Sequence, residues 1–188
     1  MASMKKIFNG IDVTLINEPH YSINSTDNLR SYEVELCRNI KSEYSSAHGL
    51  FLGEIDNPES SVIFLGIGGA TVVHQYSFTI KNDICYVASG DSVFSLKLPT
   101  LELIWVEKVD FATCFGVFWV DEYDCLISWG ELDICRLNSS GDKVWSISGP
   151  EIFTEGFEFD GDYVLVTDFD GIVHKISIET GESVPLDK

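Results

Sequence analysis

The hydrophobic and polar positions of this chain alternate over short stretches, which is the pattern of β-strands. Residues 172–178 are the clearest example, because isoleucines and His174 recur at every second position. Alternation of this kind predicts a strand with one face against a core. Apolar runs at residues 61–67 and 111–120 also have the length of strands. Helical spacing is found only around residues 30–45, where "SYEVELCRNIK" fits a strand almost as well. We therefore expect an all-β fold.

The same order of strands and turns recurs about every 40 residues. The stretches "SFTIKNDICYVASGDSVFSLKLPTLELIW" (77–105) and "VFWVDEYDCLISWGELDICRLNSSGDKVW" (117–145) align without a gap, so that Trp105 falls on Trp145. A third stretch, "GFEFDGDYVLVTDFDGIVHKISIETGESV" (156–184), follows the same plan with slips of one or two residues. Several short strands per unit at this period are typical of a propeller blade.

The repeat also bounds the number of blades. Residues 76–188 hold three repeat units, whereas residues 5–75 form diverged strands that amount to roughly one further unit. A length of 188 residues with 45% hydrophobic residues fits a single domain, 1–188. The sequence predicts a small or partial, open β-propeller of about three to four antiparallel four-stranded blades. Four blades closing a small ring are the alternative. In the open form we expect residues 5–60 to cover an exposed sheet edge.

The end of the third unit carries a motif that the earlier units share in part. Its residues are Asp170, Gly171, Thr180, Gly181 and Glu182. With the alternating strand between them, they resemble the repeat of quinoprotein (pyrroloquinoline-quinone)-type β-propellers, in which this run leads to a Trp. Trp105 and Trp145 stand at that closing position in the earlier units, whereas the third unit has Pro185. The resemblance covers roughly residues 70–188 and implies a propeller fold.

No cofactor, metal site or catalytic residue is predicted. The chain is too short for the full ring of a quinoprotein enzyme. The run Asp168-x-Asp170-Gly171 looks like part of a calcium loop, but Ile172 stands where that loop needs an oxygen donor. Turn chemistry explains the run better. No Ser or Cys stands in a nucleophile motif beside a His. The five cysteines form no CxxC pair and are expected to be reduced and buried.

The formal net charge of −18 is the dominant global feature. A field of this sign repels the phosphate backbone of nucleic acids, so we expect no nucleic-acid partner. The same field attracts cationic partners and speeds their association. No apolar run approaches the roughly 20 residues of a membrane-spanning helix, and the N-terminus lacks the apolar stretch of a secretory signal. We therefore expect a cytoplasmic protein without a membrane partner.

The repeat predicts at which end of the blades each acidic turn lies. Between residues 144 and 174 there is no Lys or Arg. Alternate turns of an up-and-down blade leave at the same end, so the turns at 121–124 and 160–162 should share one rim. Glu131, Asp168 and Asp170 should lie at the opposite rim. Carboxylates beside Tyr123 are suited to binding Lys and Arg, although turns also collect acidic residues for solvation. The candidate partner-binding residues are Asp121, Glu122, Tyr123, Asp124, Asp142, Glu158, Asp160, Asp162, Glu179 and Glu182.

These observations favour a non-enzymatic binding protein that captures a basic protein partner. The most concrete hypothesis is an immunity or inhibitor protein that neutralises a basic, nuclease-like toxin of a bacterial competition system by occluding its active cleft. One alternative is a scaffold subunit of a larger assembly. Another is a small-ligand or sugar-binding module, or a hydrolytic propeller-like enzyme, with a central pocket lined by Trp119, Trp129 and Phe169.

Overall fold

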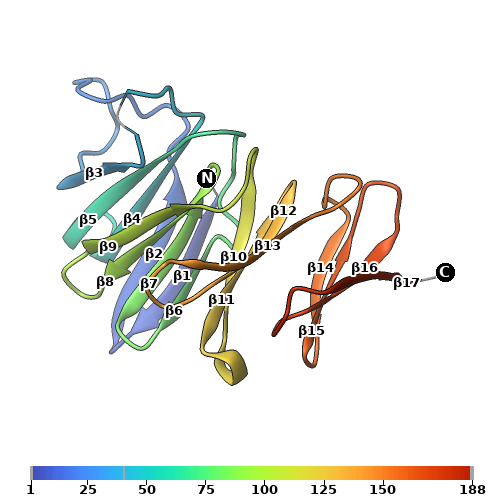
Figure 1. The fold of residues 1–188 in the computed structure, drawn as a ribbon. Helices are drawn as coiled ribbons and strands as arrows, with labels where there is room; N and C mark the ends of the chain where they lie inside the picture. The colour runs from blue at the N-terminus through green and yellow to red at the C-terminus, as the bar shows by residue number, and fades with distance from the viewer. Residues whose placement is uncertain (1, 40, 187–188) are drawn as a thin grey trace.

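Strands are the main regular structure of this protein in a computed structural model that describes residues 2–39 and 41–186 (Figure 1). The strands form four sheets that follow one another along the chain. The first sheet has the spatial order β1-β2-β4-β5-β3. Its strands are β1 (Ser3–Phe8), β2 (Ile11–Asn17), β3 (Val34–Cys37), β4 (Ser46–Glu54) and β5 (Asn57–Gly66). The expected all-β fold is confirmed.

The other three sheets each contain four antiparallel strands in sequence order, as the 40-residue repeat predicts. The second sheet comprises β6 (Phe78–Lys81), β7 (Ile84–Ser89), β8 (Ser92–Lys97) and β9 (Glu102–Lys108). The third comprises β10 (Cys114–Val120), β11 (Cys125–Gly130), β12 (Asp133–Leu137) and β13 (Lys143–Ser148). The fourth comprises β14 (Gly156–Asp160), β15 (Tyr163–Thr167), β16 (Val173–Ser177) and β17 (Ser183–Leu186). Among the described residues the only helical element is the 3-10 turn η1 (Asp121–Tyr123), so none there could span a bilayer.

The first sheet departs from the four-stranded antiparallel plan at β3. This strand pairs in parallel with β5, placing Val34 opposite Val62 and Cys37 opposite Leu65. The described residues of the range 30–45 contain no helix, so the helical alternative is wrong for them. Residue 40 lies outside the described residues. The edge of β5 offers unpaired backbone groups, and pairing them with β3 satisfies both segments.

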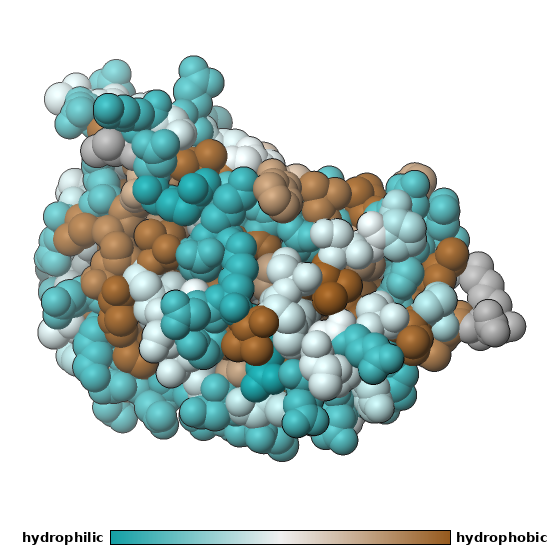
Figure 2. Space-filling view, in the orientation of Figure 1, coloured by the Kyte–Doolittle hydropathy of each residue, from teal (hydrophilic) through white to brown (hydrophobic). Residues whose placement is uncertain are grey.

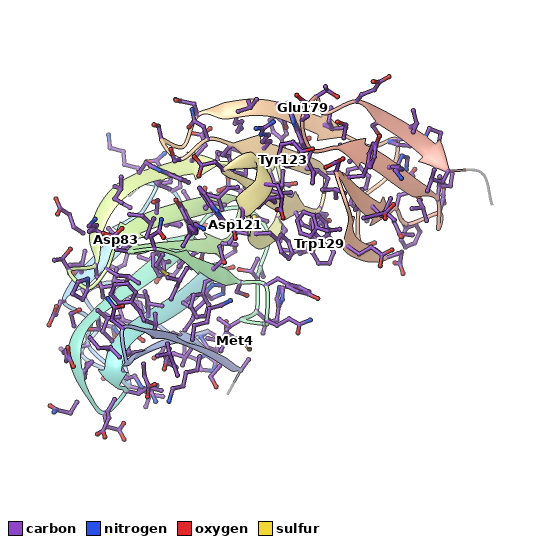
Figure 3. All side chains as sticks on the ribbon, turned by 90° about the horizontal axis from the view of Figure 1, so that it is seen from below. Met4, Asp83, Asp121, Tyr123, Trp129 and Glu179 are labelled. Atoms are coloured by element: carbon purple, nitrogen blue, oxygen red, sulfur yellow. The ribbon has the colours of Figure 1, made fainter. Side chains whose placement is uncertain are left out.

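The four sheets form an open arc, with the first and fourth sheets at its two ends (Figures 1 and 3). Figure 3 shows the arc from below, with Met4 of β1 and Trp129 of β11 toward its concave side. Strands β6 and β10, which begin the second and third sheets, contact each other. This is the arrangement of blades in a propeller that has not closed, and it confirms the open form of the predicted fold.

The core lies between successive sheets rather than in one central cluster. Along β7, Cys85 and Val87 pack toward the first sheet, while the alternate residues Tyr86 and Ala88 pack toward the third. A strand buried on both faces must be apolar at consecutive positions, which explains the continuous run at 84–88. A third cluster joins the third and fourth sheets in the same way.

Each tryptophan that closes a repeat unit packs on a glycine of the next unit. The indole Nε1 of Trp105 donates to the carbonyl of Ser139 at 3.0 Å, and a Cβ added to Gly141 would lie 2.7 Å from its ring. Trp145 and Gly181 repeat this arrangement one sheet further on. Both glycines have positive φ, +89° and +75°, so a side chain is excluded by conformation as well as by space. The Trp and Gly of the repeat motif thus hold neighbouring sheets together.

The two ends of the arc differ in how they are covered. At the first sheet, Tyr21 and Tyr32 from the segment before β3 pack on Ala47, Ile63 and Leu65. The expected covering of an open sheet edge by residues 5–60 stays a prediction, because these tyrosines pack on side chains of the first sheet itself. At the other end, hydrophobic side chains of the fourth sheet reach the surface, as Figure 2 shows on the right. They include Tyr163, Val184 and Leu186.

Candidate protein-binding site on the acidic rim

One end of the sheets carries most of the candidate partner-binding residues. We call it the acidic rim and define it by the β10–β11, β12–β13, β14–β15 and β16–β17 turns. The first and third turns of an antiparallel four-stranded sheet lie at the same end, so these four turns belong together. Figure 3 shows Asp121, Tyr123 and Glu179 along the arc from this side. The lower edge of the face in Figure 2 is mostly hydrophilic.

A hollow of about 400 Å³ opens on the rim between the third and fourth sheets, and we call it the rim pocket. Three carboxylates and three aromatic rings from the ends of β10 and β14 and their turns line it. They are Asp121, Glu122, Asp162, Trp119, Tyr123 and Phe159. The structure therefore brings four of the candidate residues, Asp121, Glu122, Tyr123 and Asp162, into one pocket.

The hydroxyl of Tyr123 donates a hydrogen bond of 2.9 Å to Asp162. Tyr123 ends the 3-10 turn η1, and the following residue, Asp124, adopts the left-handed conformation with φ of 44°. This turn sends the chain back into β11 and leaves the tyrosine ring beside the neighbouring sheet. The hydrogen bond to Asp162 raises the pKa of Tyr123, so the phenol stays protonated and remains a donor at neutral pH.

Asp121 is held from two directions. It forms an ion pair with the Lys81 ammonium of the second sheet, and it accepts a hydrogen bond of 3.0 Å from the indole Nε1 of Trp119. The hydrogen bond from Lys81 is the main cause that lowers the pKa of Asp121. The carboxylate is thus ionised and fixed in position, although Lys81 neutralises part of its charge.

Arg136 of β12 shows how a guanidinium is accommodated on this rim. Its Nη1 donates to the carbonyls of Ile178 and Glu179 at 3.1 and 2.9 Å, and Nη2 donates to the carbonyl of Tyr123 at 3.4 Å. The guanidinium carbon lies 5.6 Å from the centre of the Tyr123 ring, within the range of a cation–π interaction. Because its partners are carbonyls, Arg136 links the rim turns without pairing with a rim carboxylate.

The remaining candidate residues fall into two groups. Asp124, Asp142, Glu179 and Glu182 lie exposed in rim turns but outside the pocket, and Asp142 accepts a hydrogen bond of 3.0 Å from the side chain of Asn138. Glu158 and Asp160 lie on β14, where strand alternation sets them on the outer face of the fourth sheet. Asp160 pairs there with the Lys175 ammonium at 3.1 Å.

The pocket also contains residues that the sequence reasoning did not assign to partner binding. Trp119 and Phe159 stand two residues or fewer before the acidic turns that they flank, and both strands end at the rim. The aligned aromatic positions that precede the acidic turns of successive units could have identified them. The roles of Lys81 and Arg136 depend on contacts with residues about 40 positions away, and no local pattern indicates such contacts.

Asp168 lies in the β15–β16 turn, at the end opposite the acidic rim. This residue is fully buried in the turn, and its carboxylate accepts a hydrogen bond of 2.7 Å from His174 Nε2 and one of 2.9 Å from the backbone N–H of Ile172. The Asp-x-Asp-Gly run is therefore a hydrogen-bonded turn, and Asp170 remains exposed in it. Within the described residues no group of three or more His, Cys, Asp and Glu is placed to hold a metal ion.

The prediction of one central pocket lined by Trp119, Trp129 and Phe169 is wrong. Trp119 lines the rim pocket, Trp129 lines a different hollow with His74, Tyr76 and Phe115, and Phe169 is 63% exposed in the turn at the opposite end. These side chains occupy three separate places because they come from different ends and edges of their sheets.

The geometry defines a partial β-propeller with an acidic, aromatic-lined rim. No protein-family model matches the chain, and no curated protein sequence matches it. Among solved structures, BamB from Moraxella catarrhalis is similar over 80% of this chain and 48% of its own, with a TM-score of 0.54 and 13% identity. The Pan2 WD40 domain of Neurospora crassa is similar over 60% of this chain and 38% of its own, with a TM-score of 0.50 and 14% identity. This chain thus spans less than half the length of either β-propeller, and the similarity shows the fold.

Proposed function

We propose that this protein is a non-enzymatic protein-binding module that captures a basic protein partner on the acidic rim. The observation that carries the proposal is the rim pocket, where Asp121, Glu122 and Asp162 converge with three aromatic rings. Carboxylates bind guanidinium and ammonium groups through charge-assisted hydrogen bonds, and aromatic faces add cation–π attraction. The β-propeller fold shared with BamB and the Pan2 domain supports a protein-interaction or scaffold module in general.

Two physical arguments support a basic partner. The net charge of −18 creates a long-range field that steers cationic proteins and speeds their encounter. The internal arrangement of Arg136 has a guanidinium within cation–π distance of Tyr123 that also donates to rim carbonyls. A partner's Arg or Lys that enters the rim pocket from solvent would meet its three carboxylates.

The narrower form of the proposal is an inhibitor of a basic, nuclease-like toxin. A nuclease binds phosphates with clustered Lys and Arg side chains. A rim that presents carboxylates to those side chains would occlude the cleft that the nucleic acid needs. A purified cognate nuclease should then lose activity on DNA or RNA in proportion to the added protein, whereas a binding module without inhibitory action would leave the activity unchanged.

The test of the general proposal is a pair of charge-matched variants. Asp121→Lys/Asp162→Lys reverses two rim charges, and Glu151→Lys/Asp170→Lys reverses two exposed charges at the opposite end. Both variants change the net charge equally, so only position distinguishes them. We expect the rim variant to lose the partner that wild-type protein retains in a pull-down, while the control variant keeps it. Equal loss in both variants would contradict a localised site.

A further inference from the structure

A second hollow, of about 260 Å³, lies away from the rim pocket at the edge of β10 and β11. We call it the aromatic hollow. Its lining comes from the connection between β5 and β6, from β10 and β11, and from the loop before β14. The lining residues are His74, Tyr76, Phe115, Trp129 and Thr154. Trp129 points toward the concave side of the arc in Figure 3.

The rings around the aromatic hollow are steeply inclined to one another. The ring of Tyr76 lies 6.4 Å from that of Trp129 at 63°, and the ring of Phe115 lies 5.4 Å from it at 67°. Phe157 stacks on Trp129 at 5.4 Å and 21°, which fixes the indole plane. Rings set at such angles border a hollow from several sides, in the manner of an aromatic cage.

The polar groups of the hollow are largely used internally. The indole Nε1 of Trp129 donates to the carbonyl of Phe153 at 2.9 Å, and the Thr154 hydroxyl donates to Glu155 at 3.2 Å. The Nδ1 of His74 accepts a hydrogen bond of 3.3 Å from the backbone of Tyr76. Few donors or acceptors remain for a sugar or another hydroxyl-rich ligand, which needs several matched hydrogen bonds.

The electrostatic setting favours a cation instead. The five lining residues include no Lys or Arg, and burial lowers the pKa of His74, which leaves the imidazole uncharged at neutral pH. The faces of aromatic rings carry partial negative charge and attract ammonium and guanidinium groups. The negative net charge of the chain also attracts cations.

Further ring contacts connect the aromatic hollow with the rim pocket. Phe159, which lines the rim pocket, contacts Phe118 at 5.5 Å, and Phe118 stacks on Phe157 at 4.5 Å. Phe157 in turn stacks on Trp129. One bound partner could therefore lie along a continuous aromatic strip with a pocket at each end.

We propose that the aromatic hollow is a cation–π site that takes an alkylammonium or guanidinium group, presented as a Lys or Arg side chain of the partner bound at the rim. The identity of the carrier rests on the proposed function. The affinity of the hollow for an organic cation does not, because it follows from the rings that line it.

The test uses choline and its uncharged analogue 3,3-dimethylbutan-1-ol, which has the same shape with carbon in place of nitrogen. Nitrogen-15-labelled protein is titrated with each at matched ionic strength, and the indole Nε1–H signal of Trp129, assigned with Trp129→Phe, is followed. We expect millimolar binding of choline and at least tenfold weaker binding of the alcohol. Equal binding of both, or no shift with 100 mM choline, would overturn the site.

Two variants locate the effect. Phe115→Leu keeps an apolar side chain but removes a π face, and should weaken choline binding at least fivefold, whereas Phe169→Leu at the opposite rim should leave it unchanged. Tyr76→Leu replaces Phe115→Leu if the indole signals of the latter lose their dispersion, which would show that it is misfolded. Unchanged binding in the ring variant would also overturn the site. The Asp121→Lys/Asp162→Lys variant should still bind choline, so failure of the rim and failure of the aromatic hollow give different results.

Discussion

The hydroxyl of Tyr123 donates a hydrogen bond of 2.9 Å to the carboxylate of Asp162 and thereby joins the β10–β11 turn to the β14–β15 turn of the next sheet. The two residues come from equivalent turns of successive repeat units, 39 positions apart. The bond fixes a carboxylate and an aromatic ring in one orientation before any partner arrives. Preorganisation of this kind lowers the entropic cost of binding.

Removing this bond should affect the partner more than the fold. Tyr123→Phe keeps the ring but frees Asp162, and because the pair is exposed we expect little change in the free energy of unfolding. Partner dissociation should become about three- to tenfold faster, since complexes of one interface differ mainly in their dissociation rates. Surface-based binding kinetics measure this rate. Tyr163→Phe, on the outer face of the last sheet, is the control, and equal acceleration in both variants would contradict the role of Tyr123.

The contact between Trp145 and Gly181 should be costly to disturb. A Cβ at Gly181 would lie 2.8 Å from the indole and would have to adopt φ of +75°. Gly161 also has positive φ, +56°, but nothing lies within 4 Å of its added Cβ. Gly161→Ala should therefore cost only the conformational strain, about 1 kcal/mol, while Gly181→Ala should cost about 2–3 kcal/mol. Urea denaturation of both variants checks the difference, and similar losses would show that the indole contact contributes little.

His48 should make the fold sensitive to mild acid. It is fully buried on β4, and burial lowers its pKa from 6.5 to about 4. An unfolded histidine takes up a proton near pH 6.5, so stability is present above that pH and is lost as the pH falls toward 4. When the pH falls from 7.5 to 5, this residue alone should lower the free energy of unfolding by about 2 kcal/mol. Urea denaturation at the two pH values measures the decrease in the free energy of unfolding. This decrease should be smaller by that amount in His48→Gln, whereas equal decreases in the two proteins would exclude His48 as the cause.

The repeat made much of the fold predictable from the sequence. Strand alternation and the 40-residue period gave the three regular sheets, because each blade is formed by neighbouring segments. The spacing of Trp105, Trp145, Gly141 and Gly181 also follows directly from packing between sheets. In contrast, the parallel pairing of β3 with β5 joins segments separated by β4, and no local pattern indicates it.

The candidate site was predictable only in part, because it also depends on contacts between segments that are distant in the sequence. Turn equivalence placed Asp121 and Asp162 at one end of the molecule, but it could not show which side chains converge on a pocket. Strand alternation turns Glu158 toward the outer face of the fourth sheet, and Lys175 pairs with Asp160 across neighbouring strands. Asp168 is buried because His174, six residues later, returns beside it on the next strand.

The central claim is that the acidic rim, rather than net charge alone, binds a basic partner. The most direct measurement is the partner's association and dissociation rates across a series of salt concentrations, for wild-type protein, Asp121→Lys/Asp162→Lys and Glu151→Lys/Asp170→Lys. We predict that association slows with salt in all three proteins, since screening weakens the long-range field, and that dissociation accelerates at least tenfold only in the rim variant. Unchanged dissociation in the rim variant, or equal acceleration in both variants, would contradict the claim.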